Sequence, residues 1–194
     1  GKSYVSSNTA VGSSALSANL AGYSNSAFGL DALRNNTSGY ENSAFGYQAL
    51  KSNTGGGSNV AIGNLALSDN STSNYSNVAV GHSAMRYGTG SYNTALGFGA
   101  GINITANDNL FLGYSSGKYA GSGTSTNNTT GQNSVLIGYD VRPNADGETN
   151  EIVISGYNGT EGAIGLGSHS TLIGNSLTTT AQIMGDLTLP RTTA

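Results

Sequence analysis

The 194-residue sequence has no cysteine, and charged side chains occupy only 9% of its positions. The absence of cysteine excludes disulfide bonds, thiolate metal sites and thiol catalysis. The formal net charge is −3, so there is no basic excess to neutralise nucleic-acid phosphates or anionic lipids. No run reaches the roughly 18 apolar residues of a membrane-spanning helix. We therefore expect neither a nucleic-acid partner nor membrane insertion.

Glycine and small polar residues dominate the sequence instead. Glycine occurs 30 times, and Asn, Ser and Thr are frequent, a composition often found in disordered chains. Apolar residues nevertheless recur at even intervals, which a disordered chain does not require. We therefore expect one elongated, folded domain whose order comes from repetition.

A five-residue motif occurs ten times: Asn, a small residue, Ala, a large apolar residue and Gly. The first copy is residues 8–12, and up to residue 113 the copies follow at intervals of 16 to 18 residues. The last copies keep the length of the motif and its large apolar residue but not its Asn and Ala. The glycines that end the copies are Gly12, Gly29, Gly46, Gly63, Gly81, Gly97, Gly113, Gly138 and Gly174, with Ser155 in the remaining place. A unit this short cannot bury a core alone, so the copies must stack as a solenoid.

Each repeat contains a second short apolar segment after the glycine. The copies of this segment are Ala15-Leu16, Ala32-Leu33, Ala49-Leu50, Ala66-Leu67 and Ala84-Met85. Turn-forming residues follow, as at 35–39, and no apolar period of 3.6 residues supports a helix. Two short strands and two turns per repeat predict an all-β, parallel β-roll or β-solenoid of about ten coils. The glycines would mark the corners between the two strands of a coil, in a rod on the order of 50 Å long.

Side-chain direction leads to a prediction about assembly. Neighbouring strand residues point to opposite faces, so the Ala and the large apolar residue of a motif cannot share a face. We expect the large residue to fill the coil and the alanines to form an outward column. This column comprises Ala10, Ala27, Ala44, Ala61, Ala79 and Ala95. An outward apolar column needs cover, so we expect identical chains to pack around a shared axis as an intimate homotrimer.

The opposite orientation is the alternative. The alanines would then line a narrow interior, and the large residues would face outward. That arrangement would still leave an apolar stripe on the surface that needs cover.

The spacing divides the chain into five segments. Residues 1–7 lead into the roll, and 8–117 hold the regular repeats. Residues 118–133 contain an insertion that we interpret as a surface loop. Residues 134–185 hold divergent coils, and 186–194 form an exit strand or tail.

The chain resembles two groups of fibrous proteins in its repeated motif, in the Ala-Leu pair that follows the motif, and in turns such as Asn53-Thr54-Gly55. These are the heads of trimeric autotransporter adhesins and the shafts of bacteriophage tail fibres that carry a C-terminal intramolecular chaperone. The resemblance covers roughly residues 8–174 and rests on the number of copies. It implies a left-handed, homotrimeric β-roll that acts as a spacing or receptor-binding element on a virion or a cell surface.

Motifs for catalysis are weak. Residues 113–117 fit the Gly-x-Ser-x-Gly pattern of α/β-hydrolases, but they are a copy of the repeat and lack the strand-turn-helix context. His82 and His169 have no carboxylate at the spacing of a triad or a metal site. Residues 144–148 do not fit a calcium-binding EF-hand loop and are better interpreted as a turn, with a loop-bound Ca²⁺ as the alternative. We expect no enzymatic activity, no metal and no cofactor.

Tyrosines suggest where a ligand would bind. The chain has 11 tyrosines, whose amphipathic rings suit either neutral glycans or the shielding of coil edges and subunit seams. Loops on a rigid scaffold often carry binding residues, which makes residues 119–131 the first choice. The predicted ligand contacts are Tyr114, Tyr119, Asn127 and Asn128.

The expected function is that of a non-enzymatic fibre segment. It would be the shaft or head of a phage tail fibre or a surface adhesin, located on a virion or outside the cell, and it would space and contact a cell-surface glycan. The alternative is a free ligand-binding solenoid that binds ice or a polysaccharide. Outward Thr columns would favour ice, yet Thr9 and Thr94 are isolated, and the ten acids are too scattered for a glycan-cleaving tailspike.

Overall fold

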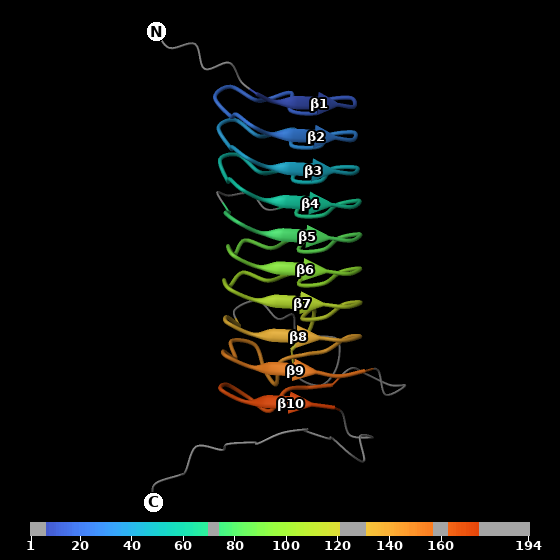
Figure 1. The fold of residues 1–194 in the computed structure, drawn as a ribbon, viewed down its shortest axis with the longest axis vertical. Coiled ribbons are helices and arrows are strands. Elements are labelled where there is room, and N and C mark those ends of the chain that lie inside the picture. Colours follow the sequence, from blue (N-terminus) through green and yellow to red (C-terminus); the bar gives the residue numbers. More distant parts are fainter. Residues whose placement is uncertain (1–6, 70–73, 121–130, 157–162, 175–194) are drawn as a thin grey trace, which may run out of the picture.

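The computed structural model describes residues 7–69, 74–120, 131–156 and 163–174, which wind into a straight stack of coils (Figure 1). Each coil contributes one strand of three residues. The strands are β1 (Thr9–Val11), β2 (Ser26–Phe28), β3 (Ser43–Phe45), β4 (Val60–Ile62), β5 (Val78–Val80), β6 (Thr94–Leu96), β7 (Leu110–Leu112), β8 (Val135–Ile137), β9 (Ile152–Ile154) and β10 (Thr171–Ile173). These residues include no helix. The expected all-β, parallel solenoid of about ten coils is confirmed.

All ten strands form one parallel sheet in sequence order, from β1 to β10. Each strand pairs in register with the next, so that Ala27 pairs with Ala10 on one side and with Ala44 on the other. Every position of the repeat therefore forms a column along the stack. At about 4.8 Å per strand, the nine steps from β1 to β10 extend about 43 Å.

The Ala-Leu segment is not a second strand, so this part of the prediction is wrong. Its leucines have a left-handed backbone, with φ of 49° at Leu33 and 52° at Leu50, whereas a strand requires strongly negative φ. The segment is a series of turns, in which the N–H of Ala32 donates to the carbonyl of Gly29 at 3.3 Å. It still pairs between coils, because the N–H of Leu33 donates to the carbonyl of Ala49 at 3.0 Å. Each of the first seven coils therefore has a strand on one side and stacked turns on the other.

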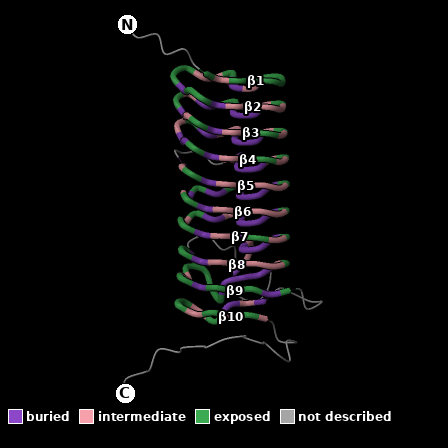
Figure 2. The backbone as a smooth tube through the Cα atoms, in the orientation of Figure 1, coloured by how far each residue is buried: buried purple, intermediate pink, exposed green. Residues whose placement is uncertain are grey.

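The alanine column faces the interior, opposite to the expected direction. Ala27, Ala44 and Ala61 are fully buried in the single chain, whereas Phe45 and Ile62 are 39% and 43% exposed. The leucines of the stacked turns explain this, since they are buried in the same core and fill the space between the two sides of the coil. Only a small side chain fits opposite them. Figure 2 shows the buried layer behind the strands, and the alternative of a narrow interior lined by alanines is confirmed.

The interior changes at Phe111, which replaces the alanine in β7 and is fully buried. On the turn side, the place of the buried leucine is taken by Gly117 in this coil and by Gly101 in the coil before it. A Cβ atom at Gly117 would lie 2.2 Å from Cδ1 of Phe111, and one at Gly101 would lie 2.7 Å from Cδ2. The phenyl ring therefore occupies the volume that leucine side chains fill in the earlier coils.

A column of asparagines precedes the strands. Its buried members are Asn25, Asn42, Asn59, Asn77, Asn93 and Asn109. The Oδ1 of Asn59 accepts from the N–H of Asn77 at 3.0 Å, and its Nδ2 donates to the carbonyl of Asn74 at 2.8 Å. The N–H and the Nδ2 of Asn59 both donate to Oδ1 of Asn42 at 3.0 Å. Since buried polar groups need partners, this column explains why the motif begins with Asn.

The predicted insertion lies partly outside the described residues. The strands on either side of it still pair in register, Leu110 with Val135. Residues 121–130, 1–6 and 175–194 lie outside the described part of the chain. The segment boundaries proposed from the sequence therefore stay predictions.

Candidate interaction surface

The outer face of the sheet has an apolar column along its whole length. The middle residue of each strand points inward, so the first and third residues point outward. The third residues are Val11, Phe28, Phe45, Ile62, Val80, Leu96, Leu112, Ile137, Ile154 and Ile173. Val11 is 55% exposed at one end of this column and Ile173 is 53% exposed at the other. We call these residues the apolar column.

The first strand residues form a second outward column that changes in character along the rod. Ser and Thr occupy it in β1 to β3, and aliphatic residues predominate from β4 to β9. Its members are Thr9, Ser26, Ser43, Val60, Val78, Thr94, Leu110, Val135, Ile152 and Thr171. No residue in either outward column is charged. The outer face of the sheet is therefore uncharged throughout and most apolar from β4 to β9.

An aromatic ladder lies beside the apolar column, at the position that follows the corner glycine. It consists of His82, Phe98, Tyr114 and Tyr139, whose ring centroids lie 4.9, 5.1 and 4.8 Å apart in that order, with interplanar angles of 8°, 8° and 9°. Phe98, Tyr114 and Tyr139 are 42% to 47% exposed. The register of the sheet places one ring in each of four successive coils, so stacking follows directly from the repeat.

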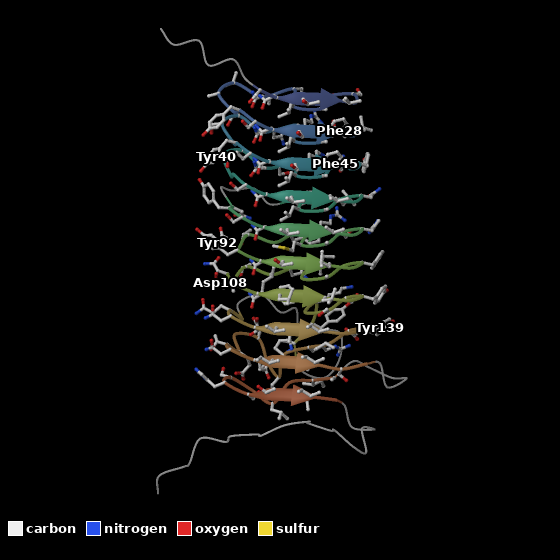
Figure 3. All side chains as sticks on the ribbon, viewed as in Figure 1. Phe28, Tyr40, Phe45, Tyr92, Asp108 and Tyr139 are labelled. Carbon is white, nitrogen blue, oxygen red and sulfur yellow. The ribbon has the colours of Figure 1, made fainter. Side chains whose placement is uncertain are left out.

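Aromatic residues also stack at other positions of the repeat. The rings of Phe28 and Phe45 lie 4.8 Å apart within the apolar column, and those of Tyr23 and Tyr40 lie 5.3 Å apart. Figure 3 shows Phe28, Phe45 and Tyr139 toward one edge of the rod and Tyr40 and Tyr92 at the other. The apolar column and the aromatic ladder therefore lie on the same side.

The glycines predicted to mark corners lie between the apolar column and the aromatic ladder. Their φ values range from 109° at Gly174 to 140° at Gly29, in a region that other residues rarely adopt. At Gly46, a Cβ atom would also lie 2.4 Å from the carbonyl oxygen of Gly63. A side chain is excluded there both by backbone conformation and by the neighbouring coil.

The predicted ligand contacts lie apart from one another. Tyr114 is 46% exposed, but Phe98 and Tyr139 stack on its ring, which leaves its edge as the accessible part. Tyr119 contacts two cations, with Nζ of Lys118 at 4.8 Å and the guanidinium carbon of Arg142 at 5.3 Å from the ring centroid. Asn127 and Asn128 lie outside the described residues.

The residues considered for catalysis or metal binding serve structural contacts. Ser115, in the Gly-x-Ser-x-Gly pattern, is 5% exposed, and its N–H donates to the carbonyl of Phe98 at 2.8 Å. His82 belongs to the aromatic ladder, and a ring nitrogen of His169 lies 3.2 Å from Nδ2 of Asn150. Within the described ranges, no three His, Cys, Asp or Glu side chains are grouped so as to hold a metal ion.

Two carboxylates fasten the last coil to the coil before it. Glu151 is fully buried, and its Oε1 accepts from the N–H of Gly167 at 2.7 Å. The Oε2 of Glu148 accepts from the N–H of Ser168 at 2.6 Å and from the Ser168 hydroxyl. These hydrogen bonds from Ser168 lower the pKa of Glu148 below its usual value. The turn at 144–148 thus contacts the next coil through Glu148, and a loop-bound Ca²⁺ at this turn stays a prediction.

Sequence reasoning missed three features: the asparagine column, the aromatic ladder and the gathering of basic residues described below. Each had a signal in the spacing. The Asn opens most copies of the motif, and Phe98, Tyr114 and Tyr139 all follow a corner glycine directly. Aligning the repeats position by position would have found all three.

In the part of the chain that the structure describes, no helix has the length and apolar character to cross a membrane. No protein-family model, curated protein or solved structure matches this chain.

Proposed function

We propose that this chain is a structural segment of a fibre, in which three copies pack by the outer faces of their sheets around a shared axis. The observation that carries the proposal is the uncharged apolar face, which extends over ten coils and is exposed or half-buried in the single chain. Contiguous apolar surfaces of this extent are typical of interaction sites.

The size of the face suits an interface between copies. Its length is about 43 Å, and its width is on the order of 10 Å along the strands and 15 Å in the four coils of the aromatic ladder, so it covers on the order of 500 Å². A specific interface buries about 800 Å² on each partner. The two areas are of the same order, so burial of this face would supply most of such a contact.

The repeat itself favours a second and a third copy as the occupants. A partner that meets the apolar residue at the same place in every coil needs the same axial period, and an identical chain has that period. A shared axis parallel to the rod keeps equivalent coils level, as in cyclic oligomers. We propose three copies, and not two, because the repeats resemble those of trimeric fibres. Because the alanines are buried and the large residues face outward, the residues of the apolar column, and not the alanines, would form the contact.

The assembly would act as a stiff spacer without enzymatic activity. Its continuous inter-coil hydrogen bonding and buried core resist bending, which suits the shaft or head of a phage tail fibre or an adhesin on a virion or cell surface. Residues on its outside would contact a cell-surface glycan. Three parallel rods of about 43 Å would form the spacing element.

The mass in solution tests the proposal. Sedimentation equilibrium of the full chain is expected to give three times the chain mass of 19.5 kDa, with a single species over a wide concentration range. A dimer would retain the apolar face as an interface but overturn the threefold axis. A stable monomer would overturn the fibre proposal and favour the free ligand-binding solenoid.

A further inference from the structure

The basic residues gather in one column of the rod. The fifth residue after the corner glycine is Arg34, Lys51, Arg86 and Lys118 in the second, third, fifth and seventh coils. These are four of the five basic residues in the described ranges, and the fifth, Arg142, is buried. We call the four the basic column. A chain with a net charge of −3 thus has one line of basic residues from its second to its seventh coil.

The stacked turns determine where this column points. Leu33 and Leu50, which directly precede Arg34 and Lys51, are fully buried, whereas the Arg34 side chain is 48% exposed. Arg34 and Lys51 occupy equivalent places in the ladder, and the carbonyl of Lys51 accepts from the N–H of Asn35 at 3.0 Å. The basic column therefore lies on the turn side of the coil, away from the outer face of the sheet. Packing of three sheets around an axis would leave it accessible.

Two acids lie close to the arginines of the column. Nε of Arg86 is 2.7 Å from Oδ2 of Asp69, and Nη1 of Arg34 is 3.7 Å from Oδ2 of Asp31. In the part of the chain that the structure describes, neither Lys51 nor Lys118 forms an ion pair. The four side chains of these two pairs are 13% to 48% exposed. Ion pairs in contact with solvent are weak, so the arginines can exchange these partners for another anion, whereas the lysines have no ion-pair partner to exchange.

The next position of the repeat adds polar and aromatic groups beside the cations. Asn35 and Ser52 follow the first two cations, and Tyr87 and Tyr119 follow the last two. Tyr87 is 45% exposed and lies under the guanidinium of Arg86, whose carbon is 4.8 Å from the ring centroid. Amide and hydroxyl groups beside a cation can hydrogen-bond to sugar hydroxyls while the cation binds a carboxylate.

We propose that the basic column binds a linear acidic polysaccharide that lies along the rod. This deepens, and rests on, the glycan contact in the function proposed above, but it does not depend on the trimer. The cations lie in one straight line at whole multiples of the coil rise, about 4.8, 14 and 24 Å from the first. A straight chain with regularly spaced carboxylates meets such a line at several points at once, and each point adds to the avidity.

Polygalacturonate is the probe, since it is linear and has one carboxylate per sugar, and its fully methyl-esterified form is the neutral control. We expect the full chain to bind polygalacturonate by isothermal titration calorimetry, with an affinity that falls as salt is raised. It should not bind the ester measurably. The double variant Lys51→Gln/Lys118→Gln should bind about three- to tenfold more weakly. Asp69→Asn should bind more tightly, because it removes the competing carboxylate from Arg86.

The double variant Ser76→Glu/Asn150→Asp is the matched control. It changes the net charge by the same two units at exposed positions just before the asparagine column, where Glu41 and Asp108 already occur with the same positive φ. Equal weakening in this control would overturn the proposal, because net charge and not the basic column would then set the affinity. Equal binding of the methyl ester, or tighter binding of a single-stranded oligonucleotide than of polygalacturonate, would also overturn it. If the chain does not bind polygalacturonate while its mass remains that of three chains, the proposed polysaccharide site is wrong and the fibre proposal stands.

Discussion

Phe111 and Gly117 share one volume in the core of the seventh coil. A Cβ atom on Gly117 would lie 2.2 Å from Cδ1 of the Phe111 ring. In the first four coils, an alanine lies where Phe111 is and a leucine where Gly117 is. In the seventh coil, the large side chain therefore comes from the strand and not from the turn side.

This relationship predicts the outcome of an exchange. Phe111→Ala should lower the free energy of unfolding by about 3–5 kcal/mol, because it leaves a cavity that the coil cannot close. The double variant Phe111→Ala/Gly117→Leu should recover part of that loss, since leucine occupies the same place with a left-handed backbone at Leu50. Urea unfolding monitored by circular dichroism measures the effect. If the double variant is as unstable as the sum of the two single variants, the two residues do not share a volume.

The asparagine column predicts a second stability effect. Asn59→Ala removes the acceptor for the buried N–H of Asn77 and the donor to the carbonyl of Asn74. Each buried group left without a partner costs about 1–3 kcal/mol, so the variant should unfold at clearly lower urea concentration. Asn35→Ala is the control, because Asn35 is exposed on the turn side. An equal effect of the two substitutions would show that the column contributes no more than a surface amide.

The sequence pattern predicts the coil number and the in-register sheet, but not the direction of the side chains. The spacing of the corner glycines requires a stack, and stacking equal units places equivalent residues above one another. The motif, however, puts two apolar residues at adjacent positions, so alternation alone cannot say which one is inside. That depends on the opposite side of the coil, where Leu33 and Leu50 fill the core.

The repeats contain a signal that would have decided the direction. Between the sixth and seventh coils the inward residue grows from Ala95 to Phe111, and the leucine place has already changed from Met85 to Gly101. Such compensation indicates two positions that face each other. The left-handed leucines had no comparable signal, because isolated leucine rarely adopts positive φ, and here the hydrogen bonds of two neighbouring coils impose it.

The apolar column predicts how a charge would affect assembly. In the proposed trimer, Ile62→Glu would place three carboxylates at one level of the shared axis, where they would repel one another and lose hydration. The variant should be monomeric at concentrations where the parent chain is trimeric, with an unchanged circular dichroism spectrum. Tyr92→Glu is the control, since Tyr92 is 60% exposed at the other edge of the rod. Sedimentation velocity distinguishes the two, and dissociation of both variants alike would contradict the location of the interface.

Glu148 predicts that the last coil responds to acid. Hydrogen bonds from Ser168 lower its pKa below the usual value of 4.5, so the folded state favours the carboxylate more strongly than the unfolded chain does. The resulting stabilisation is present above the pKa of the unfolded chain and is lost as pH falls through the lower pKa of the folded state. Carbon-13 NMR of the Glu148 carboxyl should therefore show a midpoint below 4.5, and the Ser168 amide should change with the same midpoint. In Glu148→Gln the Ser168 amide should lose that transition, whereas in Glu41→Gln it should keep it. A Ser168 amide that still titrates in Glu148→Gln would show that another acid, and not Glu148, fastens the coil.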